Sequence, residues 1–345
     1  MPVWLFCLCL ASAPPSDLPQ QYRAEIEPID LRMEKVQAYF SGAHQIATDG
    51  KRLFLRSVTD TEILVAAPDG LILATFGGKG HHPAEFGDIG VIAMAVDGGK
   101  VMAIDANFIR ARTFNLDGAY QSSFLIKPYF RLGHLPTASN VFAFSDQYTV
   151  IPTDQNSGHL AAVYDAKGQF VKYIGELLDL GGGPEFHIPG INETLWLHEG
   201  KHWYAIHKYL AMVTVFDEDF AMVTQYQIQT ARAQEMQEYV LGFQPDEHAN
   251  VPTPILSDAQ VWHGDLYILC GGWLHQLSPQ DGQVKSVTTF MGKGEAFRDL
   301  PVPYVIFYTF AILDNGGLIL GHHAQMWDHD LWRAPLPFIQ TKAKR

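Results

Sequence analysis

A pattern of two apolar segments around a short polar turn returns six times along the chain, and it constrains the fold more than any other feature. In most copies the turn contains Asp, Asn, Ser, His or Gly residues, which tolerate the backbone angles of tight hairpins. The aligned turn residues are Asp49, Asp97, Ser145, His198, His263 and Asp314. Their spacings of 48, 48, 53, 65 and 51 residues cover most of the 345-residue chain. A repeat of this length indicates a fold assembled from similar supersecondary units.

A second turn follows later in five of the units, at residues 68–70, 116–118, 165–168, 216–219 and 279–282. Two hairpins give four antiparallel strands per unit, which is the composition of a propeller blade. The chain is therefore predicted to be an all-β, six-bladed β-propeller of four-stranded antiparallel blades. The blades are expected near residues 41–80, 86–126, 134–176, 187–229, 255–292 and 302–338.

The two ends of the repeat array are incomplete in a complementary way. The sixth unit has no fourth strand before the basic tail, and an apolar-polar segment at residues 22–31 is left over at the start. We expect this segment to close the last blade, because closure removes exposed sheet edges. Residues 17–340 are thus predicted to form one domain.

Two segments of the second unit carry a family resemblance. Residues 76–86 (FGGKGHHPAEF) and 105–114 (DANFIRARTF) resemble the linker and the following strand of NHL repeats, and weaker echoes lie at 173–186 and 290–297. The resemblance implies a six-bladed propeller of the TolB-like and gluconolactonase-like superfamily. It implies no single function, since NHL-like propellers include scaffolds, ligand binders, lyases and lactonases.

Charge and the N-terminus restrict partners and location. The net charge of −13 disfavours nucleic acid, which proteins bind by neutralising phosphates with Lys and Arg. Residues 1–16 contain an apolar run followed by Ala11-Ser12-Ala13, which is typical of a secretory signal and predicts a periplasmic or secreted protein. The run is too short for a transmembrane span.

Two patterns of reactive residues are interpreted as structural. Residues 198–202 (HEGKH) match the zinc-peptidase motif, but that motif needs a helix and this segment aligns with the hairpin turns of other units. Cys270 ends an apolar run and is predicted to be a buried, inert thiol.

A ligand site is expected at the ring of residues at the starts of the innermost strands, on the top face beside the central channel. Counting five residues back from each aligned turn gives His44, Ile92, Asn140, Glu193, Asp258 and Thr309. His44, Asn140, Glu193 and Asp258 could hold a metal, with Ca²⁺ suiting the oxygen ligands and His also admitting Zn²⁺. Solvated polar residues at a channel mouth are the alternative interpretation.

Further polar residues are expected on the same face. His187 lies in a linker between blades, and His207 and His322 lie in loops between second and third strands. Residues 140–145 (NVFAFS) resemble a segment that carries a metal ligand in gluconolactonase-type lactonases, with Val141 in place of Gly. The resemblance to peptide-amidating lyases implies that histidines in such loops can hold Zn²⁺.

The longest spacing leaves an insertion at residues 229–254, whose first half is rich in helix formers and has Thr230 as a cap. The helix is expected on the top face, either as a lid over the channel or as a packed excursion. The favoured function is an exported binding or scaffold module for a protein, peptide, glycan or small molecule. The alternative is a metal-dependent hydrolase, lactonase or lyase.

Overall fold

The structure is a computed structural model, and it describes residues 19–32, 45–56, 61–87, 90–105, 110–127, 141–153, 157–178, 191–241, 255–292, 307–322 and 331–336. These residues form 24 strands and one helix. The strands are β1 (Gln20–Ile29), β2 (Gln45–Thr48), β3 (Leu53–Arg56), β4 (Glu62–Ala66), β5 (Ile72–Gly77), β6 (Val91–Asp97), β7 (Lys100–Asp105), β8 (Arg110–Asn115), β9 (Tyr120–Leu125), β10 (Ala143–Phe144), β11 (Tyr148–Pro152), β12 (His159–Asp165), β13 (Phe170–Glu176), β14 (Thr194–Glu199), β15 (His202–His207), β16 (Met212–Phe216), β17 (Met222–Gln227), β18 (Leu256–Trp262), β19 (Asp265–Cys270), β20 (Trp273–Leu277), β21 (Val284–Gly292), β22 (Phe307–Ile312), β23 (Gly317–His322) and β24 (Leu331–Pro335). The predicted signal segment, residues 1–16, lies outside the described residues.

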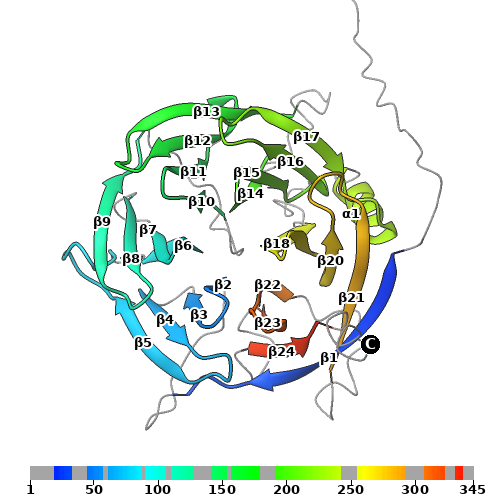
Figure 1. The fold of residues 1–345 in the computed structure, drawn as a ribbon, viewed down its shortest axis with the longest axis horizontal. Coiled ribbons are helices and arrows are strands. Elements are labelled where there is room, and N and C mark those ends of the chain that lie inside the picture. Colours follow the sequence, from blue (N-terminus) through cyan, green and yellow to red (C-terminus); the bar gives the residue numbers. More distant parts are fainter. Residues whose placement is uncertain are drawn as a thin grey trace, which may run out of the picture.

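The strands surround a central axis in the arrangement of a β-propeller (Figure 1). Four sheets have four antiparallel strands each, in the orders β2-β3-β4-β5, β6-β7-β8-β9, β10-β11-β12-β13 and β14-β15-β16-β17. The first strand of each sheet lies nearest the axis and the fourth lies outermost. The innermost strands contact one another in the closed order β2, β6, β10, β14, β18, β22 and back to β2. The predicted all-β propeller of four-stranded antiparallel units is confirmed.

The remaining eight strands form one sheet, which corrects the expectation of six separate blades. Its order is β18-β19-β20-β21-β1-β24-β23-β22. Strand β1 runs parallel to β21 from Gln20 to Ile26 and then pairs antiparallel with β24 from Glu27 to Ile29. Without β1, the outer edge of β21 would leave its backbone N–H and C=O groups unpaired. The N-terminal segment therefore joins the last unit, as predicted, and also ties that unit to the one before it.

The two ends of the ring differ in the length of their connections. Because each unit has four antiparallel strands, the connections between units begin and end at one face, which we call the long-connection face. They range from 13 residues (78–90) to 28 residues (228–255). The hairpin turns at the opposite face, the short-turn face, have only two to six residues.

Neighbouring units interlock through glycines in the outer hairpin turns. A Cβ atom on Gly168 would lie 2.1 Å from Cγ of Phe124 in the preceding unit, and one on Gly118 would lie 2.7 Å from Phe76. Gly282 and Tyr226 form the same kind of contact. The repeated glycine thus makes room for an aromatic ring of the neighbouring unit, besides adopting the positive φ that the turn requires.

Gly168→Ala is expected to destabilise the protein more than the same change at Gly99. Both glycines have φ near +75° (+76° and +74°), so alanine is strained by about 1 kcal/mol at either position. A Cβ on Gly99 meets nothing within 4 Å, whereas one on Gly168 must displace Phe124. We expect Gly168→Ala to cost about 1–3 kcal/mol more in urea unfolding. Equal costs would show that the contact with Phe124 is unimportant.

Helix α1 (Ala231–Leu241) lies within the predicted insertion, and residues 242–254 lie outside the described part of the chain. The Oγ1 atom of Thr230 accepts a hydrogen bond from the Ala233 N–H at 3.1 Å, which confirms the predicted cap. Ala233 and Val240 are fully buried against the fourth and fifth units. Figure 1 shows α1 beside the outer strand β21, away from the axis, so these eleven residues are a packed excursion. No helix in the described part of the chain is long and apolar enough to cross a membrane.

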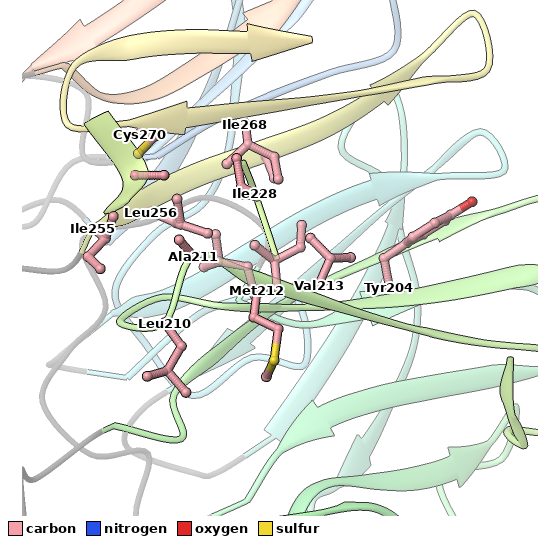
Figure 2. Packing of buried hydrophobic residues seen from close by; sticks show 14 of the residues in the cluster. Tyr204, Leu210, Ala211, Met212, Val213, Ile228, Ile255, Leu256, Ile268 and Cys270 are labelled. Carbon is pink, nitrogen blue, oxygen red and sulfur yellow. The ribbon is translucent and has the colours of Figure 1, made fainter. Parts of the chain in front are cut away.

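Both structural interpretations of reactive motifs are confirmed. Residues 198–202 form the tight hairpin between β14 and β15, in which Glu199 pairs with His202. Cys270 is fully buried beside Leu256 and Ile268, in the apolar cluster shown in Figure 2. This burial raises the pKa of its thiol to about 12, which leaves it protonated and unreactive at neutral pH.

Candidate functional site

Of the predicted ring, Asp258 and Thr309 come together in the structure. Asp258 is fully buried, and its Oδ2 atom accepts hydrogen bonds from Thr309 Oγ1 at 2.8 Å and from the Phe310 N–H at 2.9 Å. Its Oδ1 atom accepts a third bond from the Ala259 N–H at 2.8 Å. Oδ2 therefore joins β18 to β22, while Oδ1 is held within β18. A ligand-binding role for Asp258 stays a prediction.

The same kind of link continues around the axis. Thr309 Oγ1 accepts a hydrogen bond from the Ile46 N–H at 3.1 Å, and the Gln45 side chain donates to the Met94 carbonyl at 2.7 Å. Arg56 donates to Gln45 Oε1 at 3.2 Å, and burial lowers the pKa of its guanidinium to about 10. Toward the long-connection face, the axis is thus bordered by buried polar side chains that bond across unit boundaries.

Glu193 lies opposite Lys208 at the long-connection face, one residue beyond the pair that Thr194 and His207 form in the β14–β15 ladder. Glu193 accepts a hydrogen bond from the ammonium of Lys208 at 2.8 Å, and only 6% of the Lys208 side chain is exposed. The Nε2 atom of His207 lies 3.1 Å from Thr214 Oγ1, while its buried Nδ1 atom has no hydrogen-bond partner among the described residues. Burial lowers the pKa of His207 to about 4, so its imidazole is neutral at pH 7.

The other predicted site residues are placed only in part. His322 ends β23, where its backbone pairs with Phe307 of β22. His44, Asn140 and His187 lie outside the described residues. Within the described ranges, no group of three or more His, Cys, Asp or Glu side chains is arranged to hold a metal ion. The predicted metal site and its enzymatic alternative stay predictions.

A cavity that sequence reasoning missed lies on the axis toward the short-turn face. It has a volume of about 200 Å³ and is lined by residues of all six innermost strands. The last residues of four of these strands, Thr48, Asp97, Phe144 and Glu199, contribute to its wall. Three of these four residues are polar, and they lie at the end of the cavity opposite the predicted ring.

An Asp–His pair spans this axial cavity from non-adjacent units. His198 Nδ1 lies 3.1 Å from Asp97 Oδ2, and Asp97 Oδ1 accepts a hydrogen bond from the Gly98 N–H at 2.7 Å. The His198 ring packs on Trp203, with ring centroids 4.4 Å apart. When Nδ1 carries the proton, Nε2 is left as an acceptor, so the pair can bind a hydrogen-bond donor.

The signal for this pair was present in the repeat alignment. Asp97 and His198 are the aligned turn residues of the second and fourth units, and equivalent positions of a closed ring lie at similar distances from its axis. A carboxylate and an imidazole at such positions can meet across the channel. The equivalent Asp49 instead bonds Arg52 within its own turn, so the alignment alone does not specify which pair forms.

Comparisons with known proteins identify the fold alone. No protein-family model matches the sequence, and no curated protein matches it. A Bacteroides fragilis protein described as exported is 11% identical, with 88% of each chain covered and a TM-score of 0.53. A streptogramin B lyase is 12% identical, with 90% of this chain and 87% of that chain covered and a TM-score of 0.50. At these identities the similarity supports the β-propeller architecture and carries no function.

Proposed function

We propose that the protein is an exported, NHL-like propeller of six blade units that acts as a binding or scaffold module through its long-connection face. In this count the eight-stranded sheet is two blades joined by β1. The closed ring of six innermost strands supports the count. The apolar run at residues 2–10 and the small residues after it support export.

The observation that carries the proposal is the difference between the two faces. The connections at one face have 13 to 28 residues, and the turns at the other face have two to six. The long-connection face therefore contains most of the loop residues. Binding residues concentrate on loops that a rigid scaffold positions, because such loops can vary without disturbing the core. The short turns of the opposite face offer much less chain for recognising a large partner.

The described part of the long-connection face supplies a rigid base for such loops. The backbone of Lys208 accepts hydrogen bonds from the Ile255 and Leu256 N–H groups, at 2.8 and 2.9 Å, and donates to the Glu193 carbonyl. The Lys208 side chain returns to the Glu193 carboxylate. The two bonds to the Lys208 carbonyl fix the fifth unit to the fourth, and the bonds to Glu193 hold Lys208 in place within the fourth.

The net charge of −13 restricts the partner. Like charges repel at close approach, so a neutral or basic protein, peptide or glycan is favoured over an acidic one, and nucleic acid is disfavoured. A partner of this kind needs a broad contact surface, and the long connections contain more residues for one than the short turns do.

A photo-crosslinking amino acid placed at His81 is expected to capture a discrete partner in the native host, and one placed at Lys51 is not. Both side chains are exposed, but residue 81 lies in the connection between β5 and β6 at the long-connection face, whereas residue 51 lies in a short turn at the other face. The adducts would be resolved by electrophoresis and the captured protein or peptide identified by mass spectrometry.

The matched Lys51 position controls for non-specific capture. Adducts of equal intensity at both positions, or adducts at Lys51 alone, would contradict the proposal. A second turn position, Lys201, repeats this control on another unit.

A further inference from the structure

The axial cavity is lined by acidic side chains, and it lies toward the short-turn face, away from the proposed partner-binding face. Its charged wall consists of Asp97 and Glu199, and His198, the residue before Glu199, also lines it. Among the described residues that line it there is no Lys or Arg. The net charge of the whole chain is also negative, so the field of the protein adds to the local carboxylates. Such a cavity favours a cation and repels an anion.

The two carboxylates are held differently. Asp97 is fixed by His198 on one oxygen and by the Gly98 N–H on the other. The side chain of Glu199 is exposed at the end of β14, and no hydrogen bond or ion pair joins its carboxylate to another described residue. Asp97 therefore supplies an oriented charge, and Glu199 supplies one that is available to a ligand.

The innermost strands add neutral acceptors. Each of these strands is an edge strand of its sheet, and β18 and β22 are the two edge strands of the eight-stranded sheet. Each innermost strand therefore pairs with a neighbour along one edge only. The other edge turns backbone N–H and C=O groups toward the axis. Carbonyl oxygens together with a carboxylate match the three N–H donors of an ammonium group.

The number of oxygens and the size of the cavity narrow the ligand class. Two carboxylates from separate strands, one of them already bonded on both oxygens, supply fewer ligands than the six or more that Ca²⁺ or Mg²⁺ requires. A cavity of about 200 Å³ is smaller than the roughly 300–1,000 Å³ of pockets for drug-sized molecules. We propose that the axial cavity binds a small organic cation bearing ammonium groups, at a site separate from the long-connection face.

Isothermal titration of the full chain with putrescine tests the site, with butanediol as the uncharged analogue of similar length. We expect one putrescine to bind per chain and butanediol to bind at least about tenfold more weakly, because only the diamine pairs with the carboxylates. Glu199→Gln and Asp97→Asn should each weaken putrescine about two- to fivefold, which corresponds to the usual strength of partly exposed ion pairs.

Glu238→Gln is the matched control, because this exposed glutamate on α1 has the same charge and lies far from the cavity. Its putrescine affinity should equal that of the unmodified chain. No binding of putrescine, equal binding of butanediol, or an equal loss in Glu238→Gln and Glu199→Gln would overturn the proposal. Thermal unfolding of each variant shows whether the ring is intact. The outcome is independent of cross-linking at His81, so the two proposals fail separately.

Discussion

Replacing Asp105 with alanine is expected to lower the free energy of unfolding by about 3–5 kcal/mol, because it leaves a buried guanidinium without its counter-charge. Asp105 Oδ2 lies 2.7 Å from Arg112 Nη1, and the exposed fractions of the two side chains are 0% and 4%. The same carboxylate accepts a hydrogen bond from the Gly87 N–H at 3.1 Å, and Arg112 also donates to the Pro83 carbonyl. The variant should therefore also loosen the connection between β5 and β6.

Urea unfolding followed by tryptophan fluorescence measures the effect. Glu218→Ala is the control, since it removes an exposed ion pair with Lys201 and should cost at most about 1 kcal/mol. Asp105→Asn keeps the shape and one acceptor oxygen, so its cost should fall between the two. If Asp105→Ala costs no more than Glu218→Ala, the buried pair contributes nothing to the fold.

Acidification from pH 7 to pH 5 is expected to destabilise the protein by about 2 kcal/mol for each of two buried histidines. Burial lowers the pKa of His207 and of His275 to about 4, from an ordinary value of 6.5. The unfolded chain therefore takes up protons before the folded protein does. The free energy of unfolding falls as the pH drops from about 6.5 to about 4, and these two groups add no further loss at lower pH.

Urea unfolding at a series of pH values tests this expectation. The slope of unfolding free energy against pH between 5 and 6.5 should decrease in His207→Gln and again in the double variant with His275→Gln. His202→Gln, which replaces an exposed imidazole in the same unit, is the control substitution. Identical slopes in all variants would mean that both buried imidazoles titrate normally.

The fold was predictable because its main determinants are local. Asp-Gly turns such as Asp117-Gly118 mark hairpins by their own backbone preferences, and their period specifies the repeated unit. The parallel pairing of β1 with β21 was not predictable, because it depends on an unpaired edge that exists only once the ring is assembled. The partner of Asp105 was not predictable either, since Arg110 and Arg112 both follow it closely in the sequence; Arg112 forms the buried pair and Arg110 bonds Ser123.

The candidate site was predictable only as a set of positions. Counting back from each turn placed Asp258 and Thr309 at equivalent positions, and they do meet. Whether a buried carboxylate binds a ligand or holds strands together depends on its hydrogen-bond donors. For Asp258 these include the backbone N–H of Phe310, in the next unit, and such a donor leaves no mark in the sequence. The cavity beside Asp97 and His198 is a property of the closed ring and has no local signature.

The position of β1 also dictates when the molecule can be completed during synthesis. Its partners lie between Ser286 and Arg333, so β1 must wait for strands that are synthesised much later. Until then the nascent chain carries open edges on β21 and β24, both able to pair with another polypeptide. Such long-range closure slows folding. A chaperone that shields these edges should raise the yield of native protein more than one that acts on the early units.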